Sequence, residues 1–143
     1  MNYLTSVRSN PAAVNVVSLL VRILVGVSMI ILHGLPKLEK LMQGGDIKFF
    51  NFLGIGAEPS LIIALLLEII CSFLIILGLF TRLGAGMLIL VMLVAAFGAH
   101  AGDGFKVQET SLIYLCLYLL IFVYGPGKYS VDAMISRRRE SRW

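Results

Sequence analysis

The sequence predicts an all-α integral membrane protein, a single domain built as a bundle of four transmembrane helices. Its 143 residues are 59% hydrophobic and only 14% charged, which leaves too few charges to cover a soluble domain of this size. The charges also avoid four long apolar runs, each near the roughly 20 residues that a helix needs to cross the hydrocarbon. Strands of a membrane barrel would alternate in short segments, so continuous runs favour helices.

The four helices are expected at about residues 14–33, 60–80, 84–100 and 109–125. The first run is long, and no small-residue cleavage pattern follows it, so we predict a retained helix rather than a signal peptide. The second and third helices are joined by a very short connection. Pro126 cannot easily continue the fourth helix, so residues 126–143 are expected to form a basic tail.

The first connection, residues 33–59, is the longest and is expected to be structured. Gly44-Gly45-Asp46 predicts a turn. The aromatic stretch at 47–53 is too short to span the membrane. Two interpretations remain open for it: a short amphipathic helix in the membrane interface, or a segment packed over the mouth of the bundle.

Lysine and arginine placement predicts the orientation, because cytoplasmic loops carry the excess of these residues. The more basic side would hold Arg8, Arg82, Lys128, Arg137, Arg138, Arg139 and Arg142, whereas the other would hold Lys37, Lys40, Lys48 and Lys106. We therefore expect a multi-pass protein of the cell's inner membrane with both termini cytoplasmic. The tail is interpreted as a topology anchor attracted to anionic lipid, and nucleic acid is not an expected partner.

Two opposite charges fall inside the apolar runs, Arg22 in the first and Glu68 in the second. If the first helix ends near His33, the rise of about 1.5 Å per residue brings both to similar depths on antiparallel helices. A lone charge in hydrocarbon is costly, so such residues face the bundle interior and pair. We predict an intramembrane Arg22–Glu68 ion pair, with either a structural or a functional role.

Both histidines of the chain, His33 and His100, are expected at the outer ends of helices. Asp103 and Glu109 are expected at the same boundary, Lys37 is nearby in sequence, and Glu68 is expected below them inside the second helix. Such a cluster could meet a quinone head group, since histidine titrates near neutral pH, or bind a metal, with quinone favoured. Local hydrogen bonding at helix ends is the alternative. Tyr114 and Tyr118, on one face of the fourth helix, extend this polar set inward or simply pack.

The two cysteines, Cys71 and Cys116, lie inside predicted helices without a CxxC or metal-ligand spacing. We interpret them as packing residues rather than as a redox pair.

Four segments, in this order, resemble the DoxX family of small four-helix membrane proteins of bacteria and archaea. They are His33-Gly34-Leu35-Pro36-Lys37-Leu38; Glu68 with Leu77-Gly78-Leu79-Phe80-Thr81-Arg82; His100-Ala101-Gly102-Asp103-Gly104-Phe105 with Glu109; and Gly125-Pro126-Gly127-Lys128-Tyr129-Ser130-Val131-Asp132. The resemblance covers roughly residues 15–133. It implies the fold and a membrane location, and it links some relatives to thiosulfate:quinone oxidoreduction or to redox homeostasis. No residue here indicates a thiosulfate site.

Three functions follow as hypotheses. The first is a redox- or respiration-associated subunit whose outer polar site meets quinone or a small substrate. The second is a non-catalytic accessory or scaffold subunit of a larger membrane complex. The third is a small transporter acting as a homo-oligomer, although four short-looped helices leave little room for a pore and no pair of broken helices is evident. The sequence identifies no cofactor beyond the quinone that the first hypothesis includes, and the lipid bilayer is the one partner it requires.

Overall fold

The computed structural model describes residues 10–45 and 47–140, and these fold into helices with no strand among them. Arg8, Asp46 and Arg142, which enter the turn and charge predictions, lie outside the described residues. The helices are α1 (Pro11–Met29), α2 (Leu35–Gln43), α3 (Ala57–Leu77), α4 (Thr81–Val94), α5 (Phe105–Tyr124) and α6 (Val131–Glu140), with π-helical turns at Ile30–Gly34 and Ala95–Ala99 and a 3₁₀ turn at Phe52–Gly54.

Within the described ranges, four helical segments are long and apolar enough to span a membrane: Pro11–Gln43, Ala57–Leu77, Thr81–Ala99 and Phe105–Tyr124. Many large apolar side chains on them are exposed, among them Leu24, Leu66 and Leu90. In a bilayer, which is itself apolar, these side chains face lipid. The predicted class, an all-α membrane bundle, is confirmed.

The first spanning segment does not end at His33 as predicted. A π-helical turn at Ile30–Gly34 joins α1 directly to α2, and the helix continues to Gln43. Pro36 lacks an N–H group and would crowd the carbonyl one turn earlier in a regular helix. A wider turn just before the proline relieves that conflict. The proline therefore modifies the helix instead of ending it.

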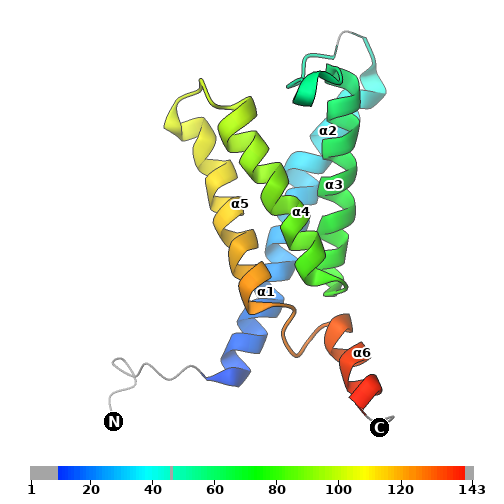
Figure 1. Cartoon of the computed structure of the whole chain (residues 1–143), viewed down its shortest axis with the longest axis vertical. Helices are drawn as coiled ribbons and strands as arrows, with labels where there is room; N and C mark the ends of the chain where they lie inside the picture. The colour runs from blue at the N-terminus through cyan, green and yellow to red at the C-terminus, as the bar shows by residue number, and fades with distance from the viewer. Residues whose placement is uncertain (1–9, 46, 141–143) are drawn as a thin grey trace.

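The bundle has two distinct ends (Figure 1). At one, here called the tail end, lie the start of α1, the α3–α4 turn and α6. At the other, here called the loop end, lie the α2–α3 and α4–α5 connections. Helix α4 packs against both α3 and α5, and α1 packs mainly against α3. Their shared core consists of Val25, Met29, Cys71, Ile75, Ala85, Leu88, Met92, Tyr114, Tyr118 and Ile121.

The aromatic stretch after α2 packs against the bundle. Residues 47–51 have no regular structure, and a 3₁₀ turn follows at Phe52–Gly54. Lys40 Nζ donates to the carbonyl of Lys48, and the Phe52 N–H donates to Ser60 Oγ at 3.0 Å, so both halves of the stretch are fastened. The Phe50 ring reaches Gly98 near the end of the third spanning segment. Of the two predicted arrangements, the packed segment is the one present.

Candidate functional site

A buried ion pair lies toward the loop end. Lys37 of α2 donates to Glu68 Oε1 of α3. The Glu68 side chain is only 2% exposed, whereas that of Lys37 is 21% exposed. The second oxygen of the carboxylate, Glu68 Oε2, has no hydrogen-bond partner among the described residues. Because a buried charge needs a partner to remain charged, Lys37 stabilises Glu68, but it leaves half of the carboxylate available.

This pair borders a cavity of about 260 Å³ between α2, α3, α4 and the aromatic stretch. Its lining is otherwise almost wholly apolar and consists of Phe49, Phe50, Phe52, Ser60, Ile63, Ala64, Leu67, Leu90, Val91, Val94, Ala95 and Ala99. Ile63 and Leu90 are also exposed on the outer surface of the bundle, so the cavity adjoins the lipid. Sites for whole small molecules usually occupy about 300–1,000 Å³. This volume therefore suits one ring or head group.

His33 lies in the π-helical turn one helical turn before Lys37, in the bundle rather than at its boundary. It is half-buried, and its ring meets that of Tyr114 edge to face with centroids 5.3 Å apart. Tyr114 in turn stacks on Tyr118, and its hydroxyl donates to Ser28 Oγ at 2.9 Å. Both tyrosines are buried. The prediction of His33 at a helix end is wrong because the helix continues through it.

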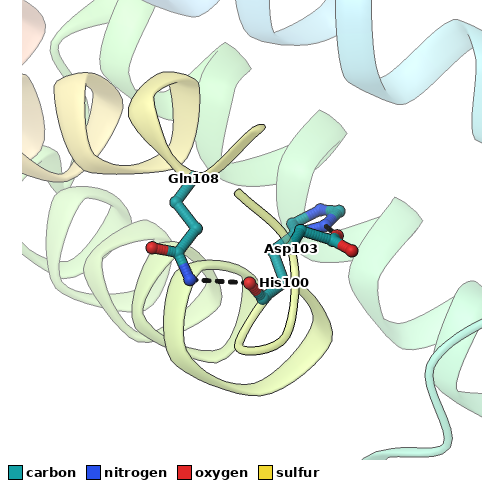
Figure 2. A network of polar contacts seen from close by, with 3 residues as sticks. All are labelled: His100, Asp103 and Gln108. Carbon is teal, nitrogen blue, oxygen red and sulfur yellow. Dashed lines mark hydrogen bonds and ion pairs between the residues drawn. The ribbon is translucent and has the colours of Figure 1, made fainter. Parts of the chain in front are cut away.

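His100 forms a separate group in the α4–α5 connection (Figure 2). Its Nδ1 lies 2.7 Å from Asp103 Oδ2, and its carbonyl accepts a hydrogen bond from Gln108 Nε2 at 2.6 Å. Both side chains of the pair are well exposed, so the pair contributes little stability and mainly shapes the turn. Glu109 is exposed. The predicted set thus divides, and no hydrogen bond or ion pair between described residues joins His100, Asp103 or Glu109 to His33, Lys37 or Glu68.

Within the part of the chain that the structure describes, no three His, Cys, Asp or Glu side chains come together as a metal site would require. The two cysteines are not bonded to each other. Cys71 is buried in the core, whereas Cys116 is exposed on the lipid-facing side of α5. Their environments differ, and the structure brings neither into a shared site.

The predicted Arg22–Glu68 ion pair is wrong. Arg22 is fully buried, but its Nη1 donates to the carbonyl of Ile75 at 3.2 Å and its Nη2 donates to the carbonyl of Tyr129. The prediction placed the end of the first helix at His33, and the helix extends ten residues further. That extension, about 15 Å at 1.5 Å per residue, moves Arg22 to the tail end and brings Lys37 to Glu68.

Arg22 holds residues 125–132, here called the docking segment, against the tail end. Besides the Arg22 bond to Tyr129, the N–H of Lys128 donates to Asn15 Oδ1 at 2.7 Å. Gly78, which ends α3 with φ of +69°, lies beside both Arg22 and Ser130. The segment therefore follows the surface of the bundle into the first turn of α6.

Asp132 completes this attachment from the first turn of α6. Its Oδ1 accepts from the N–H of Phe80 at 2.9 Å, and its Oδ2 accepts from the N–H and the hydroxyl of Thr81 at 3.0 and 2.9 Å. These donors are at the start of α4, where backbone N–H groups lack helical partners. The Asp132 N–H donates to the carbonyl of Gly78. A carboxylate of α6 thus caps α4.

The sequence did not predict the roles of three residues in these sites. Lys37 is the partner of Glu68, Asp132 caps the start of α4, and Ser72 is a buried polar side chain one helical turn from Glu68. One signal was present for Lys37. Val25, Met29, His33 and Lys37 recur every four residues, which places them on one helix face and indicates that this face continues beyond Pro36. No comparable pattern indicates Asp132, because its partners are far away in the sequence.

Comparison with known proteins supports one family. The family model described as DoxX matches residues 17–101, more than half of the chain. The chain belongs to the DoxX family. The matched range includes Arg22, Lys37, Glu68 and Gly78, but neither Tyr118 nor Asp132. The DoxX assignment agrees with the four-helix fold and with the resemblance carried by the ordered segments.

Two relatives are uncharacterized proteins of Haemophilus influenzae. One is 37% identical over 114 residues, which cover 73% of this chain and 80% of the relative. The other is 34% identical over 92 residues, which cover 62% of this chain and 61% of the relative. No solved structure matches. The family and membrane location of this DoxX protein are therefore shown, and its chemistry has to be argued from its own residues.

Proposed function

We propose that this DoxX-family protein is a redox-associated membrane protein that binds the head group of a lipid-soluble quinone, or a small substrate of similar chemistry, in the Lys37–Glu68 cavity. The observation that carries the proposal is a buried ion pair at the wall of an apolar cavity that adjoins the lipid. Ionisable residues inside membrane bundles usually mark functional sites. The His100–Asp103 pair, exposed in a loop, lacks such a cavity.

The chemistry of the cavity matches a quinone head group in two respects. The aromatic side chains of Phe49, Phe50 and Phe52 offer faces and edges to a planar ring. Lys37 is a cationic donor suited to a carbonyl oxygen of that ring. Because Ile63 and Leu90 border both the cavity and the lipid, a ligand with an isoprenoid tail would leave its tail in the bilayer.

The proposal is tested by equilibrium binding of a short-chain quinone to the full chain in lipid nanodiscs. A charge-assisted hydrogen bond contributes about 1.5–3 kcal/mol, so Lys37→Met should weaken binding by about tenfold or more. Glu68→Gln should weaken it as well, because it removes the carboxylate that positions Lys37. Lys106→Met, which replaces an exposed lysine of α5, is the matched control.

Retained affinity in both cavity variants, with the variants still folded, would exclude this cavity as the quinone site. Equal loss in Lys106→Met would show that general charge, rather than the cavity, attracts the ligand. A narrower version of the test replaces Ala64 on the cavity wall by Leu. The larger side chain should fill part of the cavity and reduce binding without removing a charge.

The same proposal includes an orientation, with the tail end facing the cytoplasm of the cell's inner membrane. It is supported by the basic residues at that end, namely Arg82, Lys128, Arg137, Arg138 and Arg139. Positive charge concentrates on cytoplasmic loops. Single cysteines introduced at Ser136 and at Gly102 test it in cells: a membrane-impermeant thiol reagent should label the cysteine at 102 and not the one at 136. The reverse pattern would invert the orientation.

A further inference from the structure

Polar atoms without partners gather at one place in the bundle interior. Four buried side-chain atoms of the described residues lack a hydrogen-bond partner: Arg22 Nε, Glu68 Oε2, Ser72 Oγ and Tyr118 Oη. Arg22 is at the tail end and uses its other nitrogens. The remaining three belong to neighbouring side chains of α3 and α5, all nearly or fully buried. Their grouping points to a common ligand.

The three groups belong to neighbouring positions of α3 and α5. Glu68 and Ser72 are one turn apart on α3, so they share a helix face. The Tyr118 side chain of α5 is near both Glu68 and the hydroxyl of Ser72, although no hydrogen bond of good geometry joins the two hydroxyls. Lys37 occupies Glu68 Oε1 from the cavity side. Glu68 Oε2 is therefore the oxygen left for the hydroxyls of Ser72 and Tyr118.

The number and type of these groups match one water molecule. An unpaired buried polar atom costs about 1–3 kcal/mol, so three unpaired atoms together would be a large penalty for a small bundle. A buried water typically makes about three hydrogen bonds to such groups. It can donate to Glu68 Oε2 and to Ser72 Oγ while accepting from the Tyr118 hydroxyl, which satisfies all three.

We propose that Glu68, Ser72 and Tyr118 bind an ordered water molecule that links the carboxylate at the cavity wall to the hydroxyls inside the bundle. This water holds the free oxygen of Glu68 beside the cavity, a role that rests on the proposed ligand there. The other titratable groups around this site are Lys37 of α2, Cys71 of α3, Tyr114 of α5 and His33 of the π-helical turn. Tyr114 already donates to Ser28, so it does not compete for the water.

The water site is tested by hydroxyl-radical footprinting of the full chain in nanodiscs, in which radicals form from the water nearest each side chain. Tyr118 and Met29 are both fully buried, and both side chains react readily with radicals. The proposal expects Tyr118 to be labelled at several times the rate of Met29. Ser72→Ala removes one ligand of the water and should lower labelling of Tyr118 several-fold.

Thermal unfolding of the same samples is the second measurement. A bound water and unpaired hydroxyls predict opposite changes in the melting temperature of the variants. If the hydroxyls bind water, Ser72→Ala and Tyr118→Phe should lower the melting temperature, because each removes a satisfied hydrogen bond. If the hydroxyls are simply unpaired, both substitutions should raise it. Tyr124→Phe, at an exposed tyrosine of α5, is the control and should change neither readout.

Labelling of Tyr118 no faster than Met29, or a raised melting temperature in both variants, would overturn the water site. Neither measurement uses a quinone. A failure here would therefore leave the binding test of the cavity unaffected, and loss of the proposed quinone site would leave these two readouts unchanged.

Discussion

Two charged side chains are buried among the residues that the structure describes, Arg22 and Glu68, and they differ in what surrounds them. Two nitrogens of Arg22 donate hydrogen bonds to main-chain carbonyls, one at the end of α3 and one in the docking segment. Glu68 has a side-chain partner, a neighbouring cavity and a free oxygen. A charge bound to the backbone fixes chain segments in place, whereas a charge beside a cavity is available to a ligand. Burial alone does not separate the two cases.

The same contrast assigns a role to two of the segments that resemble the DoxX family. Residues 77–82 and 125–132 meet at the tail end, where Asp132 caps α4 and Gly78 makes room for Arg22 and Ser130. These segments therefore have a structural role. The loop end, by comparison, has the cavity, the ion pair and both π-helical turns, and such turns are frequent at functional sites.

Gly78→Ala should have the largest effect and would test the tail end as a structural site. The added Cβ would overlap Arg22 Nη1 and lie 2.5 Å from Ser130 Cβ, at a φ of +69° that alanine adopts poorly. Strain and overpacking together should destabilise the bundle by about 4 kcal/mol, measured by SDS unfolding in mixed micelles. Gly86→Ala is the control: its Cβ would meet Phe122 at an ordinary 3.5 Å, so little loss is expected. Equal stability of the two variants would contradict the tight packing around Gly78.

Arg22→Met should lower stability by about 3 kcal/mol, because two hydrogen bonds from a charged group are lost. It should also loosen the docking segment, which is measured as faster trypsin cleavage after Lys128. Quinone binding at the loop end should remain within twofold of the unchanged chain. An unaltered cleavage rate would show that the segment is held without Arg22.

Lys37→Met tests the contribution of the ion pair toward the loop end to stability. It leaves the Glu68 carboxylate buried without its cation, and a loss of about 2 kcal/mol is expected. Glu68→Gln should cost less, about 1 kcal/mol, because the partly exposed lysine can turn toward the loop end and regain water. Equal effects in the same micelle assay would show that the pair behaves symmetrically and that Lys37 is as confined as Glu68.

Asp132→Ala should lower stability by about 1 kcal/mol, which is typical for loss of a helix cap. Asp103→Ala is the matched control, since that carboxylate is 50% exposed and, among the described residues, is paired with His100 alone. Its removal should change stability by less than about 0.5 kcal/mol. If the two variants unfold alike, Asp132 does not stabilise the start of α4.

The sequence by itself determined the spanning segments, because hydrophobic length and the absence of charge are local properties that any arrangement in a bilayer must obey. It also identified Glu68 and Arg22 as residues to explain, since polar groups in apolar runs are costly wherever they lie. His33 and Lys37 were singled out only as polar residues at the outer boundary. Later spans were placed closely for the same reason: α5 at Phe105–Tyr124 overlaps most of the predicted range 109–125.

Only the tertiary structure decided which of these residues meet. The π-helical turn carried the first helix past Pro36. Because of this shift in register, Arg22 bonds to main-chain carbonyls and Glu68 pairs with Lys37, instead of the two pairing with each other. Helix register and the docking of residues 125–132 depend on packing between segments far apart in the chain, where one added turn moves a side chain by about 5.4 Å. Local patterns do not contain that information, so the cluster predicted at one end became an ion pair at a cavity and a separate pair in a loop.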